Sequence, residues 1–254
     1  MTSVSLNAVR ALDILLILGD AGSDGLTLAQ ITKRAGGGKS AVHRSLTSLV
    51  QKGFVEPTHQ RGGYRLGPTI AILAKTQVDL EKQTQQLIPG MTEFARATGF
   101  TVYLMVQAGV DAVCADMVSR SVGKQLAMGV GGRVPMGVAA GSLALLSLMP
   151  DSVAEEIMEA NATRYLKTPA LRELNKDIVA EKRRAAIERG FAINMGYYLP
   201  GEGGIGLPVP AKSHRDINVA VSFNAPLELM TDEWMDKIVE QLKECLGSAY
   251  RSSS

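Results

Sequence analysis

A helical pattern followed by a small hairpin, within residues 27–66, constrains the fold of this chain more than any other segment. Residues 39–49 repeat apolar side chains at helical spacing, and Gly53 ends the run. Two short apolar runs then flank a polar tip from Thr58 to Gly63, which is typical of a β-hairpin. A helix, a turn, a second helix and a hairpin in this order predict a winged helix-turn-helix, whose usual partner is duplex DNA.

Two helices are expected before the turn. The first runs from about Asn7 to Leu18, with Ala8, Leu12, Leu15 and Leu16 on one face at helical spacing. Thr27, with Gln30 three residues later, has the pattern of a capping box and should start the second helix. That helix is expected to end near residue 35, before three consecutive glycines.

The third helix follows the turn Gly36-Gly37-Gly38, and Ser40 is expected to cap it. Its inward positions are Val42, Leu46, Leu49 and Val50. The opposite face is cationic, so we expect its N-terminal part to reach DNA. The predicted DNA contacts are Lys39, Ser40, Ala41, His43 and Arg44 on the helix, Arg61 at the hairpin tip and Arg65 as a phosphate contact. For His43, a structural or phosphate role and base reading both remain open.

The charge distribution supports this interpretation. Residues 1–66 hold eight Lys or Arg against four Asp or Glu, whereas residues 67–254 hold nineteen against twenty-one. The small net charge of +2 therefore conceals a basic N-terminal unit. Concentrated positive charge of this kind is the electrostatic signature of phosphate-backbone binding.

A linker helix is expected next, because Pro68 is a good first helical residue. It should run from Thr69 to about Leu87, with a break at Pro89 before a helical segment that ends at residue 98. The expected organisation is a DNA-binding domain at 1–67, the linker helix at 68–88 and a sensor domain at 89–254.

The sensor domain alternates apolar strands with grouped helices. Strands are expected at 100–106, 111–117, 124–128, 192–194, 205–209 and 217–223, and helices at 139–149, 153–160, 169–189 and 232–248. Strands before and after grouped helices favour an antiparallel α+β sheet over a doubly wound one. The fold class is therefore α+β, with a winged helix-turn-helix joined to an antiparallel sensor domain.

Several short segments, in order, resemble the IclR family of bacterial transcription regulators across nearly the whole chain. In the first domain they are 10–15 (RALDIL), His43-Arg44 and 64–67 (YRLG). In the second they are 98–104 (TGFTVYL), 132–135 (GRVP), Ala140-Gly141 and 144–146 (ALL). The resemblance implies a GAF-like effector domain, a homodimer or dimer of dimers, and binding to palindromic operator DNA.

The resemblance also implies where an effector binds. Backbone amides at Ala139 and Ala140, at the start of the 139–149 helix, would hold a carboxylate, which suits the positive end of a helix. The remaining implied pocket positions are Asn194, Gly204, Ser222 and Asn224. Asn194 stands where the family usually has an acid, Gly204 where it has a cysteine, and Asn224 where a serine is common.

These differences remove an acid and a thiol and leave space beside neutral amides. A hydroxylated or aromatic carboxylate is therefore expected rather than glyoxylate or pyruvate. Met128 is a predicted pocket residue, and Tyr197 and Tyr198 could widen the pocket, although ordinary core packing is an alternative for all three. Arg133 and Lys124 could meet the acid directly, but surface or structural ion pairs are favoured.

Other motifs that could indicate nucleotide binding, metal binding or catalysis lack the structural context that they require. Residues 201–206 have the spacing of a dinucleotide fingerprint, but Pro208 and Pro210 forbid the required helix, so a loop with close backbone approach is expected. Gly38-Lys39-Ser40 resembles the end of a phosphate-binding loop but follows a helix. The three histidines share no ligand spacing, so no metal and no cofactor is expected. Ser142 lacks the pattern of a nucleophile elbow, so no catalytic residue is predicted.

The expected function is a DNA-binding regulator that responds to a small acid, not an enzyme. An enzyme of small acids with a fused DNA-binding domain is the alternative, and a DNA-binding architectural protein is a third class. Two distant cysteines and the lack of a long apolar run predict a cytoplasmic protein with no membrane partner.

Overall fold

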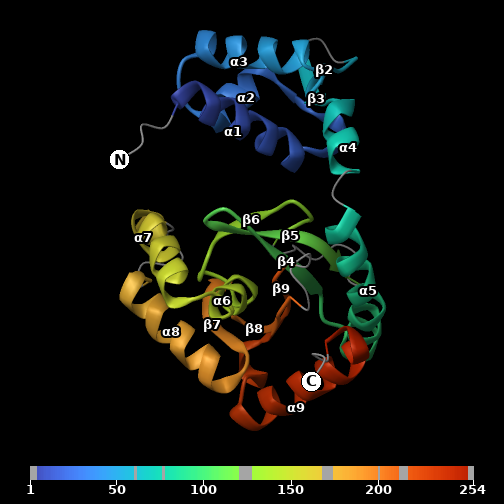
Figure 1. The fold of residues 1–254 in the computed structure, drawn as a ribbon, viewed down its shortest axis with the longest axis vertical. Helices are drawn as coiled ribbons and strands as arrows, with labels where there is room; N and C mark the ends of the chain where they lie inside the picture. The colour runs from blue at the N-terminus through green and yellow to red at the C-terminus, as the bar shows by residue number, and fades with distance from the viewer. Residues whose placement is uncertain are drawn as a thin grey trace. The chain divides into compact units, whose positions relative to one another are not determined.

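The computed structural model describes residues 5–59, 62–75, 78–119, 128–167, 174–199, 201–211 and 217–250. The chain divides into two compact units, Met1–Val78 and Asp79–Ser254 (Figure 1). Across the described part of the chain, none of the helices is long and apolar enough to cross a membrane. Arg61, Lys124 and all but Met128 of the strand expected at 124–128 lie outside the described residues, as do the side chains of Tyr197 and Tyr198.

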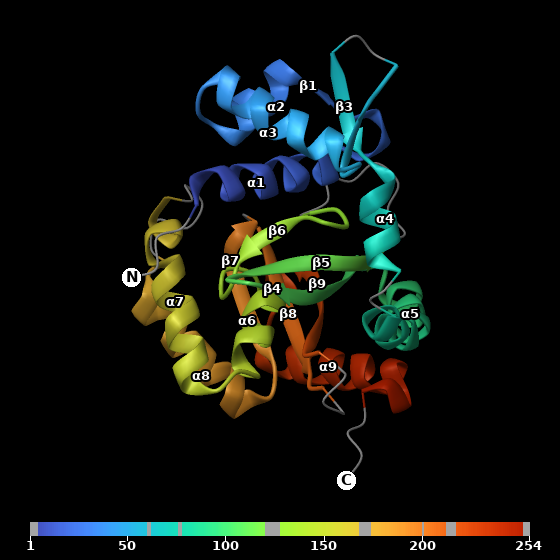
Figure 2. The same cartoon turned by 45° about the horizontal axis from the view of Figure 1, so that its top comes forward.

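The first unit has the predicted order of helices and hairpin (Figure 2). Its elements are α1 (Leu6–Asp20), β1 (Leu26–Thr27), α2 (Leu28–Ala35), α3 (Lys39–Gln51), β2 (Val55–Pro57), β3 (Gly63–Leu66) and α4 (Pro68–Ala74). The three strands form an antiparallel sheet in the order β1-β3-β2. This is a winged helix-turn-helix, as the sequence predicts.

The start of α2 confirms the predicted capping box. The Thr27 hydroxyl accepts a hydrogen bond from the Gln30 amide at 3.4 Å, and the Gln30 side-chain oxygen accepts from the Thr27 amide at 2.8 Å. The pair satisfies two amides that have no partner inside the helix. Local sequence therefore sets where this helix begins.

The apolar face that the spacing picks out on α1 is not the one that the structure buries most deeply. The structure buries Ile14 and Leu18 completely, whereas Leu12 is 61% exposed and Leu16 is 40% exposed. Apolar residues lie all around this helix, so periodicity alone does not say which stripe meets α2 and α3. An apolar stripe of Leu6, Val9, Leu12 and Leu16 is left exposed on the other side.

The predicted cap of α3 is also wrong. Gly38, not Ser40, is the N-cap, and no side chain caps the helix. Gly36 and Gly37 have φ angles of 69° and 85°, a left-handed backbone that glycine adopts without strain. α3 therefore begins two residues earlier than a cap at Ser40 would place it, and Ser40 lies inside its first helical turn.

The single linker helix expected from Thr69 to Leu87 is instead two helices, α4 and α5 (Val78–Thr98). Pro89 lies inside α5 and does not break it. A proline removes one helical hydrogen bond, but α5 buries Leu87, Met91 and Phe94 in the core on both sides of it. Packing of this apolar face overrides the local penalty.

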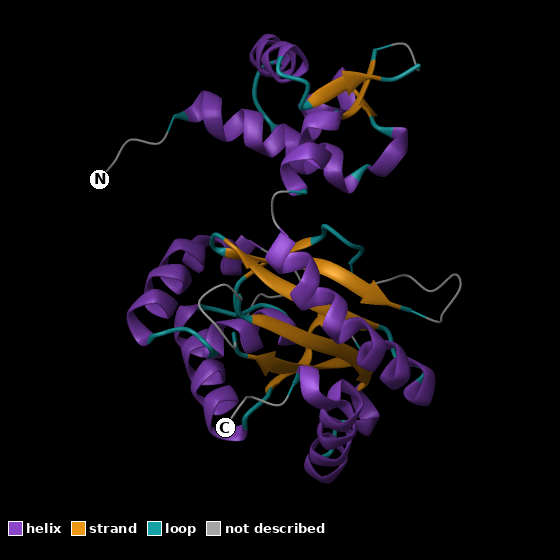
Figure 3. Cartoon of the chain, turned by 45° about the vertical axis from the view of Figure 1, so that its right-hand side comes forward, coloured by secondary structure: helices purple, strands orange, loops and turns teal. Residues whose placement is uncertain are grey.

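The second unit is built on one six-stranded antiparallel sheet in the order β6-β5-β4-β9-β8-β7 (Figure 3). The strands are β4 (Val102–Ala108), β5 (Asp111–Val118), β6 (Arg133–Pro135), β7 (Ala192–Leu199), β8 (Glu202–Val209) and β9 (Val219–Pro226). The remaining helices are α6 (Ala140–Ser147), α7 (Asp151–Lys167), α8 (Lys176–Arg189) and α9 (Asp232–Leu246). The α+β class and the antiparallel sheet are as predicted.

Alternating side chains of the strands fill two cores, one on each face of the sheet. Tyr103, Met105 and Cys114 pack against α6, α7 and α8. Val102, Leu104 and Phe223 pack on the opposite face against α5 and α9. Because both faces are covered, the strands read as nearly continuous apolar runs.

Residues 201–206 are not the expected loop. Most of them belong to strand β8, which pairs with both β7 and β9. Glycines weaken the strand signal in sequence, so the pattern resembled a turn. The expected close backbone approach is confirmed, because a Cβ at Gly206 would overlap the Ala140 carbonyl group.

We predict that Gly38→Ser raises the melting temperature of the protein. Gly38 has φ −80° and ψ 139°, which any residue adopts, and a Cβ there would meet no atom within 4 Å. A serine would cap α3 and restrict the unfolded chain, which stabilises by roughly 0.5–1 kcal/mol. Gly36→Ala is the matched variant and should destabilise, because its φ is 69°. Calorimetry of the full chain measures both melting temperatures. Equal shifts in the two variants would contradict the assignment of Gly38 as the N-cap of α3.

Candidate nucleic-acid interface and ligand pocket

The N-terminal half of α3 presents a cationic surface. Lys39, Ser40, His43 and Arg44 are exposed, Ala41 is half-buried, and Val42 and Leu46 are buried in the core of the unit. The buried residues fix the rotation of the helix, so the cationic residues face solvent. All five residues predicted on α3 therefore lie along its exposed side or at its edge.

Two hydroxyls on the same helix are already engaged. Thr47 donates to the His43 carbonyl at 2.9 Å, and Ser48 donates to the Arg44 carbonyl at 3.1 Å. Such bonds to the preceding turn are common for Ser and Thr in helices. They leave Lys39, His43 and Arg44 as the long polar side chains of this surface.

One of the predicted DNA contacts, Arg65, forms an ion pair within the hairpin. Arg65 on β3 faces Glu56 on β2, and its Nε and Nη2 atoms both lie 2.7 Å from the Glu56 carboxylate. Both side chains remain about 40% exposed. A phosphate contact by Arg65 would therefore have to share this guanidinium with Glu56.

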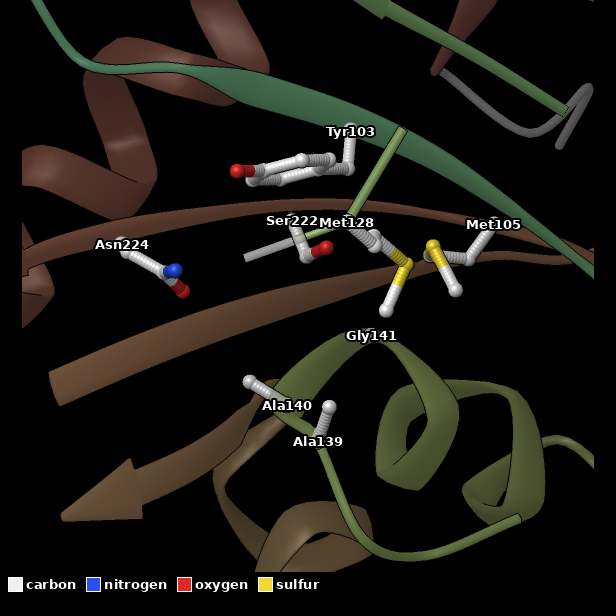
Figure 4. A pocket seen from close by; sticks show the side chains of 8 residues that line it. All are labelled: Tyr103, Met105, Met128, Ala139, Ala140, Gly141, Ser222 and Asn224. Carbon is white, nitrogen blue, oxygen red and sulfur yellow. The ribbon is translucent and has the colours of Figure 1, made fainter. Parts of the chain in front are cut away.

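In the second unit, a buried pocket lies between the sheet and the start of α6 (Figure 4). The side chains on the sheet are Tyr103 and Met105 from β4 and Ser222 and Asn224 from β9. Met128, Ala139, Ala140 and Gly141 complete the lining. An adjoining cavity shares Ala139, Ala140 and Asn224 and adds Asn194, Glu202, Gly203 and Gly204. The seven predicted effector residues all line one or both cavities.

Strand register brings these side chains together. Asn194 on β7 is paired with Gly204 on β8, and Gly204 is paired with Asn224 on β9. Tyr103 on β4 is paired with Ser222 on β9. The polar groups thus form two cross-strand rows on the face of the sheet that α6 covers.

Glycines allow α6 to approach the sheet. A Cβ at Gly141 would lie 2.6 Å from the Ser222 Oγ atom, and one at Gly204 would lie 3.2 Å from the Ala140 Cβ atom. Larger residues would push the helix away or fill the cavity. The close approach places the first turn of α6 against the polar rows.

Two side chains organise the entry to α6. Ser142 Oγ accepts from the Ala139 amide at 3.0 Å and donates to the Ala139 carbonyl at 2.9 Å. The Asn194 side chain, 8% exposed, donates to the Val138 carbonyl at 2.7 Å. The first-turn amides after Ala139 have no acceptor inside the helix, so their N–H groups are suited to bind an anion.

The pocket is small and nearly neutral. The two cavities have volumes of about 30 and 20 Å³, enough for a few water molecules. Among the lining residues only Glu202 is charged. Arg133 is not in the lining but lies 3.7 Å from Asp111, which fits the structural ion pair favoured from the sequence. Burial raises the pKa of the nearby core thiol of Cys114 to about 12, so this cysteine is not a nucleophile.

Sequence reasoning missed five residues that line the two cavities: Tyr103, Met105, Gly141, Glu202 and Gly203. Tyr103 and Met105 alternate along β4 with the residues of the opposite core, and this period of two is the signal that could have found them. No group of three or more His, Cys, Asp or Glu residues able to hold a metal ion occurs in the described ranges.

A winged helix-turn-helix joined to a second α+β unit that carries a pocket is consistent with a DNA-binding regulator of transcription. The IclR helix-turn-helix domain matches residues 8–59, and the family described as bacterial transcriptional regulator IclR C-terminal matches residues 75–249. Together these matches span most of the chain. The protein belongs to the IclR family of transcriptional regulators.

Named relatives agree with this assignment. HTH-type transcriptional regulator Rv1719 of Mycobacterium tuberculosis is 32% identical over 216 residues, 80% of this chain and 82% of the relative. Transcriptional repressor IclR of Escherichia coli is 23% identical and is matched over 82% of this chain and 76% of its own length. These relatives are named as regulators or repressors of transcription.

Solved structures share the fold. An IclR regulator from Alicyclobacillus acidocaldarius matches with a TM-score of 0.71 at 21% identity, over 98% of both chains. An IclR homologue from Microbacterium hydrocarbonoxydans, solved as a complex with 4-hydroxybenzoate, matches with a TM-score of 0.69 at 20% identity, over 97% of this chain and 100% of the homologue.

We predict that Asn194→Asp destabilises the protein at neutral pH by about 1–3 kcal/mol, because an ionised carboxylate cannot donate to the Val138 carbonyl. Burial and the facing carbonyl would raise the folded-state pKa of the new acid above its unfolded value. Stability should therefore recover as the pH falls through that raised pKa, since the protonated acid can donate again. Urea unfolding across pH measures this. Asn224→Asp, whose side chain is half-buried, is the control, and an equal pH dependence in both variants would contradict the role of Asn194.

Proposed function

We propose that this protein binds palindromic operator DNA and that a small organic acid in the α6 pocket changes its operator affinity. One observation carries the proposal: a single chain joins an exposed cationic recognition helix to a buried pocket at a helix N-terminus. The helix would bind DNA, and the pocket would bind the acid that changes DNA affinity. The family membership supports the combination. Its DNA partner would place the protein in the cytoplasm.

The DNA-binding part of the proposal rests on α3. An α-helix fits the major groove of B-form DNA, and its N-terminal residues reach base edges. Ser40, Ala41 and Arg44 are the proposed base-facing residues, and Lys39 would meet phosphate. Arg61 and Arg65 remain proposed contacts of the hairpin, with Arg65 shared with Glu56. For His43, the proposed role is either base reading or a structural or phosphate contact.

A homodimer fits the exposed surface of α1. The stripe of Leu6, Val9, Leu12 and Leu16 is apolar and lacks a covering partner among the described residues of the first unit. A second copy of the same stripe would cover it in a two-fold arrangement. Two-fold symmetry in the protein requires two-fold symmetry in the DNA site, which is why a palindrome is proposed. A dimer of dimers would repeat this unit.

The proposed effector is a hydroxylated or aromatic monocarboxylate. Its carboxylate would accept hydrogen bonds from the first-turn amides of α6, and Ser222 or Asn224 would meet a hydroxyl group. The complex of one IclR homologue with 4-hydroxybenzoate supports this class. The present cavities are too small for a ring, so Met105 and Met128 would have to rotate. Thioether side chains change rotamers readily.

Regulation then follows from linkage. An acid that binds two arrangements of the protein unequally changes operator affinity by the same free energy. In the chain, α4 and α5 connect the unit that binds DNA to the unit that would bind the acid. The sign of the effect on transcription depends on where the operator lies relative to the promoter.

We predict that Arg44→Gln weakens operator binding by about tenfold, the loss expected for one charge-assisted contact. Lys39→Gln should flatten the dependence of log affinity on log salt by about 0.9 for the lost phosphate contact. Fluorescence anisotropy across salt concentrations measures both. Lys82→Gln, an exposed cation on α5, is the control and should change neither value. Unchanged binding in both α3 variants would overturn the proposed interface.

We predict that Gly204→Ala weakens acid binding by roughly tenfold and leaves operator binding of the free protein unchanged. The added Cβ would lie 3.2 Å from the Ala140 Cβ atom and 3.3 Å from the Asn224 Oδ1 atom, and so would occupy the cavity. Gly129→Ala is the matched control, because a Cβ there meets no atom within 4 Å. Calorimetry with a panel of aliphatic and aromatic acids provides the readout. Tight glyoxylate binding without aromatic binding would contradict the proposed effector class.

A further inference from the structure

A second cavity lies at the edge of the sensor sheet, between α8 and the edge strand β7. Its volume is about 190 Å³, several times that of the α6 pocket. Lys182, Ala185, Ala186 and Arg189 line it from α8, and Phe191, Ile193 and Met195 line it from β7 and the turn before it. We call this cavity the α8–β7 groove.

The groove is formed by residues that recur at helical spacing on α8 and at every second position along β7. Positions 182, 185, 186 and 189 form one face of a helix, and the two alanines at its centre keep the space open. Phe191, Ile193 and Met195 alternate along the chain and therefore point to one side of the strand. The walls are mainly apolar, and a cavity of about 150 Å³ of this kind can hold a benzene ring.

The charges lie at the ends of the groove. Lys182 and Arg189 are two helical turns apart on α8, on either side of the alanines. Arg189 lies over the Phe191 ring at 5.6 Å and bonds Asp232 at 2.9 Å through one nitrogen, which leaves other N–H groups of its guanidinium. Burial lowers the pKa of Lys182, an effect that Glu181 partly offsets.

We propose that the α8–β7 groove is a second ligand site, which takes an amphipathic monocarboxylate of about the size of benzoate. The ring or short chain would pack on Phe191, Ile193 and the alanines, and the carboxylate would pair with Lys182 or Arg189. Charge complementarity selects an acid over a neutral compound of the same shape. This site is separate from the α6 pocket, and its occupation does not depend on the proposed regulatory function.

The groove and the α6 pocket share one strand. Asn194, which holds the loop before α6, points to one side of β7, and Ile193 and Met195 line the groove on the other. A ligand in the groove would therefore contact the back of the strand that helps to form the pocket.

Methionine methyl groups distinguish the two sites by nuclear magnetic resonance. Met195 lines the groove, and Met105 and Met128 line the α6 pocket. In the methyl-labelled full chain, with the signal assigned by Met195→Leu, sodium benzoate should shift the Met195 methyl resonance in a saturable manner. Ala185→Leu fills the groove from an exposed helical position and should weaken this binding by at least about tenfold.

Two comparisons test the chemistry. Benzyl alcohol, a neutral compound of similar shape, should bind the groove about tenfold more weakly than benzoate, and Lys182→Gln should weaken benzoate binding. Gly204→Ala, which blocks only the α6 pocket, should leave the Met195 shift unchanged. The proposal is overturned if benzoate does not shift the Met195 resonance, if the shift survives Ala185→Leu, or if benzyl alcohol binds equally well.

Discussion

The fold of the second unit depends on direct contact between the first turn of α6 and strand β8. Gly206 on β8 lies directly against the backbone of Ala140 and Gly141, with no side chain between them, and Gly141 also lies against the Ser222 side chain of β9. At the other end of α6, the buried Arg183 donates to the Leu146 carbonyl at 3.0 Å and the Met149 carbonyl at 2.6 Å. The helix is thus held at both ends, and the first-turn amides that have no acceptor inside the helix lie above the polar rows of the sheet.

Much of this arrangement could be predicted from local sequence. The capping box at Thr27 set the start of α2, and the hairpin pattern set the wing. The pocket positions came from a family resemblance, because no local rule brings Asn194 to Gly204 and Gly204 to Asn224. Those pairings join consecutive strands, but the glycines of β8 weaken its strand pattern in the sequence.

Other features required the tertiary structure. α1 has apolar residues on several sides, and only packing decided that Ile14 and Leu18 are buried while Leu12 is exposed. Pro89 favours a break by its own chemistry, but the apolar face of α5 holds the helix together. In α5 the burial of apolar surface therefore outweighs a local penalty of about 3 kcal/mol.

A fixed α6 also limits how a ligand can act. Because both ends of the helix are held by these contacts, an acid in the pocket would first be accommodated by side chains or by the sheet. The thioethers of Met105 and Met128 are the most adaptable part of the lining. β7 lies at one edge of the sheet, and its pairing with β8 is irregular after Met195. Displacement of Asn194 with β7 would break its bond to Val138 and so release the loop that precedes α6. The hydrogen bond between β7 and this loop is therefore the contact through which the pocket and the α8–β7 groove would act on the same part of the fold.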